Sequence, residues 1–253
     1  MDLKLKGLRA IVTGGTKGIG RAIAQTLIDE GAQLAFCARN ASEVAAVAAE
    51  FSSTGATVLG CAVDVGDEAA LAAFVAQAST AMGGIDIVVA NVSALAVGND
   101  EAGWKSGFDV DMMGTVRLVN AAMPSLEKSQ HASIITISSV SAREIDFAAG
   151  PYGAFKAAVI HYTQGLAFHL AGKKIRANTV SPGNTYFAGG IWDQIEQGNP
   201  ALFKEALALN PTGRMASPQE VANAVVFLAS PAASFITGTN LLVDGALTRG
   251  VQL

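Results

Sequence analysis

Seven short apolar segments rich in β-branched residues recur along the chain, and alanine-rich segments of helical length separate them. The apolar segments are LRAIVT (8–13), AQLAFCA (32–38), TVLGCAV (57–63), IDIVVA (85–90), ASIITIS (132–138), IRANTVS (175–181) and NLLVD (240–244). Strands that alternate with helices form βαβ units and pair in parallel. Because the segments are continuously apolar, helices should cover both faces of the sheet. The pattern predicts an α/β fold with a doubly wound, seven-stranded parallel sheet.

The size and charge of the chain fit one such sheet. Of the 253 residues, 51% are hydrophobic, which is enough to bury both faces of a sheet in a single domain over residues 1–253. Only 15% are charged, the net charge is -4, and the lysines and arginines are scattered. This gives no basic surface for nucleic acid or an anionic membrane. The expected partners are a small molecule and other subunits.

Several other classes of protein are also excluded by the pattern. No apolar run reaches the roughly 20 residues of a spanning helix, and no basic segment followed by an apolar one opens the sequence, so we expect a cytoplasmic protein. Cys37 and Cys61 lie in apolar strand segments and are expected to be reduced thiols. The three histidines are scattered without ligand spacing, so no metal site is expected.

One stretch, 182–217, interrupts the regular order of strands and helices. It is rich in glycine and proline around a short amphipathic piece that contains Ile191, Trp192 and Ile195. A long surface connection would explain it, but connections of this length are uncommon inside compact domains and often serve as lids. We therefore expect a lid over the substrate.

A glycine-rich turn, TGGTKGIG (13–20), lies between the first strand and the first helix. Glycines let a backbone turn sharply beside a pyrophosphate, and the following helix N-terminus offers N–H groups. The turn alone is a weak signal, but its position after the first strand indicates a Rossmann-type dinucleotide site. The expected cofactor-binding residues are Gly14, Thr16, Lys17, Gly18, Ile19 and Gly20.

The end of the second strand bears on which dinucleotide binds. Sites for NAD usually place a carboxylate there to bond the ribose 2′-hydroxyl, whereas this strand ends in CARN (37–40). Arg39 and Lys17 are cations that suit a 2′-phosphate, although each alone would also fit a solvated loop. Their joint placement favours NADP(H).

Tyr152 and Lys156 are four residues apart at the start of a helical segment, so they share one face. A phenol titrates near pH ~10, and a neighbouring ammonium favours the phenolate, which makes the pair a proton donor and acceptor for an alcohol or carbonyl. Ser139 ends the fifth strand at the edge where such sheets bind ligands, and its hydroxyl is expected to hold the substrate oxygen. Strand alternation should turn only one of Ser138 and Ser139 into the site.

The motifs together resemble the short-chain dehydrogenase/reductase family over essentially the whole chain. They are TGGTKGIG, Asp64-Val65, IDIVVAN, ISS, YGAFK, SPG and VDG, in family order and spacing. The resemblance implies that Tyr152 is the acid/base, that Lys156 also holds the nicotinamide ribose, and that Ser139 polarises the carbonyl.

The resemblance also implies further cofactor contacts and an assembly. The adenine would contact Asp64 and Val65, Asn91 would lie beside the cofactor, and the nicotinamide would lie near Pro182 and Gly183. The family suggests a homotetramer built from helices that here span about 102–128 and 152–171, and their many alanines permit close packing.

The chain departs from the family at three places. Asp111 stands where the family has a catalytic asparagine, and we expect either an ionised carboxylate that favours protonated Lys156 or a buried neutral donor; both predict a shifted pH profile with activity kept. Ser93 replaces a glycine and either adds a polar contact or fits an altered turn. Thr185 comes two residues before the position of the family's carboxamide-binding threonine, so its contact is carried over only as a hypothesis.

The sequence therefore predicts an NADP(H)-dependent oxidoreductase that interconverts a carbonyl and a secondary alcohol. One alternative is a 3-oxoacyl-thioester reductase, for which Arg143 and Arg214 would be the basic residues at the site mouth. An alternative of another class is a dinucleotide-binding sensor or scaffold without catalysis. Turnover with carbonyl substrates separates the three.

Overall fold

The seven apolar segments form the seven strands of one parallel sheet in the computed structural model, which describes residues 1–251. The strands are β1 (Arg9–Thr13), β2 (Gln33–Ala38), β3 (Val58–Ala62), β4 (Ile87–Ala90), β5 (Ser133–Ile137), β6 (Arg176–Pro182) and β7 (Asn240–Val243). Their order is β3-β2-β1-β4-β5-β6-β7, so the winding reverses between β1 and β4. The predicted doubly wound sheet is confirmed, and ligands of such sheets bind where the order reverses.

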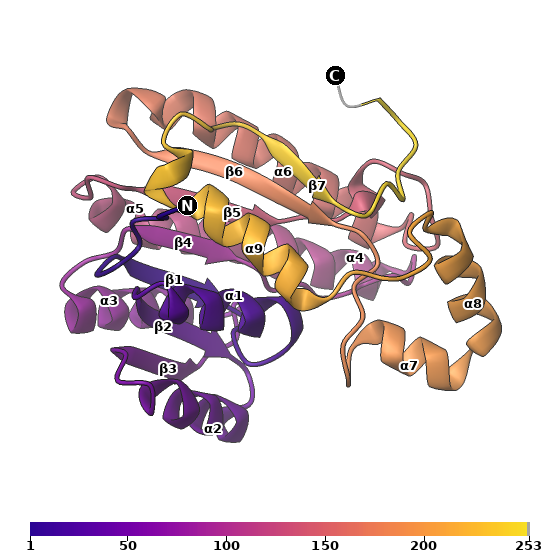
Figure 1. Cartoon of the computed structure of the whole chain (residues 1–253), viewed down its shortest axis with the longest axis horizontal. Helices are drawn as coiled ribbons and strands as arrows, with labels where there is room; N and C mark the ends of the chain where they lie inside the picture. Colours follow the sequence, from indigo (N-terminus) through magenta and orange to yellow (C-terminus); the bar gives the residue numbers. More distant parts are fainter. Residues whose placement is uncertain (252–253) are drawn as a thin grey trace.

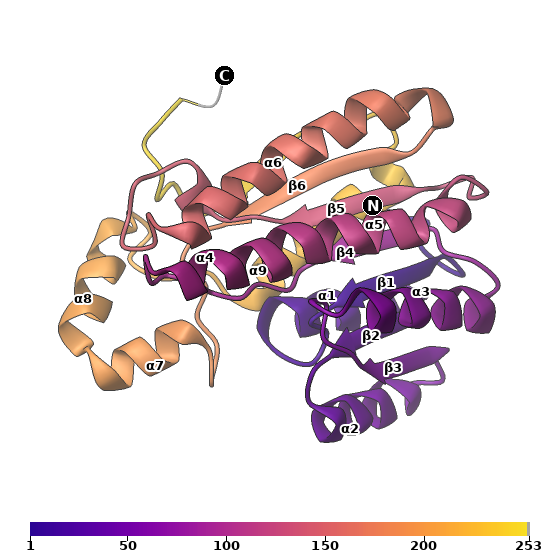
Figure 2. The same ribbon diagram turned by 180° about the vertical axis from the view of Figure 1, so that it is seen from behind.

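Helices cover both faces of the sheet, as the apolar strands predicted (Figures 1 and 2). One face packs against α1 (Gly18–Asp29), α2 (Ala41–Ser52) and α9 (Pro218–Ala229). The other packs against α3 (Glu68–Met82), α5 (Gly114–Leu126) and α6 (Pro151–Leu170). Successive residues of β1 show the alternation, since Val12 faces the first layer and Ile11 the second.

The remaining helices are short. α4 (Glu101–Gly107) continues through a π-helical turn, η1 (Phe108–Met113), into α5. Three 3-10 turns follow: η2 (Val140–Ala142), η3 (Ala171–Lys173) and η4 (Pro231–Ala233). Within residues 1–251 no helix is long and apolar enough to cross a membrane. The same residues contain no group of three His, Cys, Asp or Glu side chains that could hold a metal ion.

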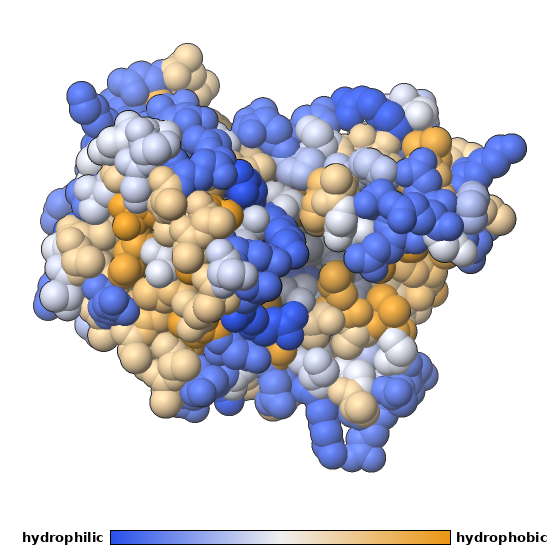
Figure 3. All heavy atoms as spheres, turned by 90° about the horizontal axis from the view of Figure 1, so that it is seen from below, coloured by the Kyte–Doolittle hydropathy of each residue, from blue (hydrophilic) through white to orange (hydrophobic). Residues whose placement is uncertain are grey.

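The stretch expected to be a lid folds into two helices, α7 (Ile191–Gly198) and α8 (Pro200–Leu209), which project from the C-terminal end of β6 (Figure 1). We call residues 184–216 the α7–α8 excursion. Its ends meet in a parallel bridge between Thr185 and Ala216, where Tyr186 N donates to Ala216 O (2.9 Å). In Figure 3 a hollow near the middle of the view separates the excursion from the larger body.

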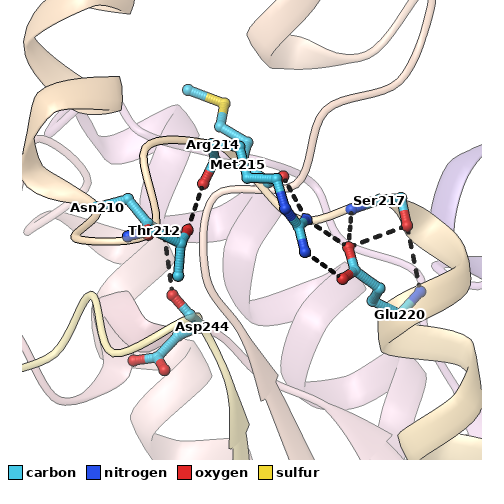
Figure 4. Close-up of polar contacts among 7 residues, drawn as sticks. All are labelled: Asn210, Thr212, Arg214, Met215, Ser217, Glu220 and Asp244. Atoms are coloured by element: carbon cyan, nitrogen blue, oxygen red, sulfur yellow. Dashed lines mark hydrogen bonds and ion pairs between the residues drawn. The ribbon is translucent and has the colours of Figure 1, made fainter.

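Polar contacts anchor the C-terminal end of the excursion (Figure 4). Asn210 Nδ2 donates to the carbonyl oxygen of Asp244 (3.0 Å), and Arg214 pairs with Glu220 (2.6 Å) at the start of α9. The hydrogen bond from Arg214 and the backbone N–H of Ser217 lower the pKa of Glu220 to about 2. Glu220 and Ser217 form a capping box, so the anchor and the first turn of α9 share the same carboxylate.

Candidate active site

The glycine turn closes tightly between β1 and α1. A Cβ atom on Gly20 would clash with the carbonyl oxygen of Gly14, which itself has a positive φ of +72°. Gly18, the first residue of α1, also has a positive φ, of +52°, which glycine adopts without strain. Lys17 occupies the N-cap and makes no capping side-chain bond, so the first turn of α1 presents backbone N–H groups. This cradle fits the pyrophosphate of a dinucleotide.

Asn91 fastens the end of β4 to the glycine turn. Its Nδ2 donates to the carbonyl oxygen of Thr13 (3.0 Å), and its backbone N donates to Thr13 Oγ1 (3.0 Å). A Cβ atom on Gly14 would lie only 2.9 Å from Asn91 Nδ2. The Asn91 side chain, which was predicted to lie beside the cofactor, therefore holds the glycine turn in its conformation.

The region around Lys17 and Arg39, expected to bind the adenosine ribose, carries a carboxylate that the sequence analysis did not include. Arg39 is exposed at the end of β2, but Lys17 Nζ forms an ion pair with Glu43 Oε1 at 2.8 Å. Sequence reasoning missed Glu43 because it looked for a carboxylate at the strand end, and Glu43 lies in the first turn of α2. Nearby, Asp64 is exposed and accepts from Gly66 N (2.9 Å), and Val65 is buried.

Lys156 is one turn along α6 from Tyr152 and is only 3% exposed. Its Nζ atom lies 5.8 Å from the centroid of the Tyr152 ring, donates to Ile137 O (3.0 Å), and forms an ion pair with Asp111 Oδ1 (3.0 Å). Pro151 starts the helix, and Tyr152 N donates to Ala96 O (3.1 Å), which holds the first turn in place. The helix thus positions a phenol beside a fixed ammonium.

Asp111 is buried in the π-helical turn η1, with 2% exposure. Besides the ion pair with Lys156, its Oδ2 accepts from Ala94 N (2.9 Å), and its carbonyl oxygen accepts from Thr115 Oγ1 (2.7 Å). π-helical turns are frequent at functional sites because they re-aim a side chain within a helix. Asp111 Oδ2 therefore has a hydrogen-bond donor, whereas Oδ1 is close enough to Lys156 for an ion pair but accepts no hydrogen bond.

The loop after β4 shows where Ser93 lies. Its Oγ accepts from Leu95 N (3.0 Å), and Leu95 has a positive φ of 50°. The Ser93 hydroxyl is bonded within its own turn, as expected if Ser93 fits an altered turn and does not add a polar contact to the site.

The two serines at the end of β5 diverge. Ser138 Oγ donates to the carbonyl oxygen of Lys156 (2.8 Å) and so fastens α6 to the sheet. Ser139 Oγ instead contacts Ser141, with Ser141 N donating to it (3.1 Å). Ser138 is thus taken up by the helix backbone, whereas the Ser139 hydroxyl is bonded within η2. Ser141 itself was not identified from the sequence.

Beyond β6, the backbone passes close to the C-terminal segment. A Cβ atom on Gly183 would lie 2.9 Å from Asp244 Cα, so only glycine fits without displacement. Thr185 Oγ1 donates to Gly183 O (3.0 Å) and is used in a local turn. The ring of Phe187 lies 2.5 Å from where a Cβ of Gly18 would stand. The excursion therefore touches the glycine turn through Phe187.

The remaining aromatic side chains pack mainly inside the excursion. The Trp192 ring lies 6.5 Å from Phe203, and it meets Phe147 of the body at 5.6 Å. The hydroxyl of Tyr186 lies within hydrogen-bond distance of Glu196 (2.7 Å), whose carboxylate raises the pKa of Tyr186. These contacts pack the rings of the excursion against one another and against the body.

Fold and site together define a dinucleotide-dependent α/β oxidoreductase, and comparison with known proteins narrows this class. A family model described as enoyl-(acyl carrier protein) reductase matches residues 14–248. The chain is 40% identical to isoepoxydon dehydrogenase of Penicillium expansum, over 98% of this chain and 97% of that protein. The chain belongs to the short-chain dehydrogenase/reductase family.

Solved structures agree with this assignment. L-sorbose reductase from Gluconobacter frateurii, complexed with NADPH and L-sorbose, superposes with a TM-score of 0.91 at 29% identity, covering 99% of this chain and 100% of that one. A 7α-hydroxysteroid dehydrogenase complexed with NADH and 7-oxo glycochenodeoxycholic acid gives a TM-score of 0.89 at 31% identity, covering 97% and 96%. The family thus includes proteins complexed with either dinucleotide.

Proposed function

We propose that the chain is an NADP(H)-dependent oxidoreductase that interconverts a carbonyl and a secondary alcohol. The observation that carries the proposal is the fixed ammonium of Lys156 beside Tyr152, at the sheet edge where Ser139 and the glycine turn also lie. When bound, the nicotinamide would donate or accept the hydride. Tyr152 would give or take the proton at the substrate oxygen, which Ser139 contacts, and Lys156 would hold the ribose.

Turnover with a panel of substrates tests this function. NADPH oxidation is measured with cyclohexanone, L-sorbose and acetoacetyl thioester, and NADP⁺ reduction with cyclohexanol. We expect turnover with the ketones or the alcohol. Binding of NADPH without turnover of any member would instead identify a dinucleotide-binding sensor or scaffold.

The thioester arm of the panel tests the second candidate, a 3-oxoacyl-thioester reductase. The description of the matching family model names an acyl carrier protein and so supports an acyl-thioester substrate, but an enoyl reductase reduces a carbon–carbon double bond and not a 3-oxo group. Of the two basic residues proposed to receive an acyl carrier, Arg143 is exposed, whereas Arg214 is paired with Glu220 at 2.6 Å. Because one charge is already compensated, we place the simple carbonyl first. A kcat/KM for the thioester above that for both ketones would reverse this order.

The preference for NADP(H) rests on Arg39. The strand end carries no carboxylate, and L-sorbose reductase is complexed with NADPH, but Glu43 offsets the charge of Lys17. An arginine on a phosphate contributes charge-assisted bonds of roughly 1.5–3 kcal/mol. Arg39→Ala should therefore lower kcat/KM for NADPH about 10- to 100-fold and leave that for NADH within about twofold. Glu43→Gln is the control, because it removes a charge from the same corner and should not weaken NADPH.

Asp111 is proposed to act as an ionised carboxylate that stabilises the Lys156 ammonium. The 3.0 Å ion pair and the bond accepted from Ala94 N support this alternative over a neutral donor. Removing a negative charge favours proton loss from neighbouring groups, so Asp111→Asn should keep activity and move the pH–rate profile for alcohol oxidation about one unit toward acid. An unchanged profile contradicts this role.

We further propose a homotetramer that uses α4, α5 and α6. Large apolar side chains are exposed on α4 (Trp104, 41%), on η1 between α4 and α5 (Phe108, 47%) and on α6 (Phe168, 80%). Exposed apolar patches of this kind mark subunit contacts. Light scattering should show a tetramer for the native chain and smaller species for Phe168→Glu, and a native monomer would contradict the proposal.

A further inference from the structure

Large apolar side chains are exposed in the loops that follow β4, β5 and β6. These strands are neighbours in the sheet, so the loops at their C-terminal ends lie side by side at the edge that carries the candidate active site. The exposed side chains are Leu95 and Val97 after β4, Ile145 and Phe147 after β5, and Ile191 at the start of α7. Apolar surface that gathers in one place marks a site where a ligand or partner binds.

A hydrogen-bonded carboxylate ties the loop around Phe147 to Ser139. Asp146, the residue before Phe147, accepts at Oδ2 from Ser141 Oγ (2.6 Å) and at Oδ1 from Ala148 N (2.8 Å). The Oγ atoms of Ser141 and Ser139 are 3.2 Å apart. Both oxygens of the carboxylate therefore hold the loop folded back toward the serine at the end of β5.

The residue after Phe147 ties the same loop to the helix that carries Tyr152. The carbonyl oxygen of Ala148 accepts from Gly153 N (3.0 Å), and Gly153 directly follows Tyr152 in α6. A Cβ atom on Gly153 would lie 2.8 Å from the carbonyl oxygen of Ser141 and 3.0 Å from that of Ala148, so only glycine permits this approach. The backbone of Phe147 is therefore fixed relative to Tyr152 as well.

The ring of Phe147 is held on one side and open on the other. Its centroid lies 5.6 Å from that of Trp192 in α7, and the two rings meet edge to face at an angle of 80°. Trp192 is buried, whereas 54% of Phe147 stays exposed. Because the contact with Trp192 restricts the rotamer of Phe147, an apolar group can pack on the open part of the ring at little cost in side-chain entropy.

Building on the proposed function, we propose that Phe147 determines substrate specificity, and that the substrate carries an aromatic or other apolar ring close to its carbonyl or alcohol group. The ring packs on the open part of Phe147 while Tyr152 and Ser139 engage the oxygen. Leu95 and Ile145 add apolar surface at the same edge of the sheet. An apolar contact of this kind changes the preference between two substrates about tenfold or more.

Two ketones that differ only by a ring test the proposal. 4-Phenyl-2-butanone and 2-butanone share the same methyl ketone, and each is titrated into the enzyme with NADP⁺, which has no hydride to give. Titration followed by nuclear magnetic resonance measures both dissociation constants, including that of a weak ligand. We expect the native chain to bind 4-phenyl-2-butanone about tenfold more tightly than 2-butanone.

Variants of Phe147 separate the ring contact from general effects on the loop. Phe147→Ala should weaken binding of 4-phenyl-2-butanone about tenfold and change that of 2-butanone less than about twofold. Phe147→Leu keeps an apolar side chain and should retain the binding of 4-phenyl-2-butanone within about threefold. Phe235→Ala is the matched control, because Phe235 is fully exposed but lies at the opposite edge of the sheet, where Ala177 N at the start of β6 donates to Thr237 Oγ1 (3.1 Å). It should leave both dissociation constants unchanged.

Each other outcome overturns the inference. If Phe147→Ala weakens the two ketones equally, Phe147 only supports the loop. Unchanged binding in Phe147→Ala, or a native chain that binds the two ketones equally or not at all, also rejects the role. The dissociation constants are measured without turnover, so failure of the proposed function is seen separately, as an absence of turnover across the whole substrate panel.

Discussion

The candidate site has two walls that are built differently. The sheet-side wall, formed by Asp111, Ser139, Tyr152 and Lys156, stands on strands and helices whose side chains belong to the two large core clusters. We propose that the α7–α8 excursion forms the other wall, and its own cluster has three buried residues, Trp192, Ala206 and Met215. In this arrangement, groups that must align with reacting atoms would lie on the rigid wall, and groups that shape the substrate space would lie on the wall that can adjust.

The largest expected effect tests the rigid wall at its centre. Tyr152→Phe removes the phenolic hydroxyl beside Lys156, and general acid/base catalysis contributes about 10²- to 10⁴-fold to a rate. Steady-state assays should therefore show kcat about 10³-fold lower, with NADPH binding retained. Retention of more than a tenth of the activity would show that another group moves the proton.

The second prediction tests how closely the backbone packs at the glycine turn, next to the rigid wall. Gly20→Ala places a methyl group against the backbone of Gly14, which cannot move aside easily, so we expect a loss of about 3 kcal/mol in the free energy of unfolding. Denaturant unfolding measures it. Gly165→Ala, also within a helix but with no atom within 4 Å of its Cβ, is the control and should be neutral or slightly stabilising.

The third prediction concerns the opposite end of the same sheet. Burial alone would raise the pKa of Asp86, but hydrogen bonds from Arg9 and Ser129 and the charge of Arg9 lower it overall. A carboxylate with a lowered pKa stabilises the fold above its unfolded pKa of about 4, and this contribution is lost as the pH falls below that value. Asp86→Asn should cost about 2 kcal/mol at pH 7. The difference from the native chain should shrink in acid, and a constant difference would contradict the assignment.

The smallest expected effect lies in the excursion. Trp192→Ala removes the centre of a cluster that can open without unfolding the sheet, so its cost is limited to the local stability, about 1 kcal/mol. Hydrogen exchange should show faster exchange over 187–209 and unchanged protection in β4 and β5, with a raised KM. Trp104→Ala, which alters the half-exposed tryptophan of α4, should leave exchange in the excursion unchanged.

What the sequence could predict depends on whether a residue lies in a regular element or in a loop whose partners are set by the fold. All seven strands, the glycine turn and the Ser139, Tyr152 and Lys156 placement follow from periodicity and spacing, because they are regular elements. Glu43 and Asp146 were missed because their partners are brought to them by the fold: Lys17 from another βα turn, and Ser141 through the path of an irregular loop. The two helices of the excursion were hidden by its glycine and proline content.

The π-helical turn at 108–113 lies between an exposed apolar surface and a buried carboxylate on the same helical segment. Each residue of an α-helix turns the chain by about 100°, and a π-helical turn contains about one residue more than an α-helical turn. The extra residue offsets α4 from α5 in rotation. As a result, the exposed Trp104 and Phe108 point outward while Asp111, three residues further on, is buried against Lys156. Removing one residue here would rotate the outer apolar surface and the inner carboxylate relative to each other.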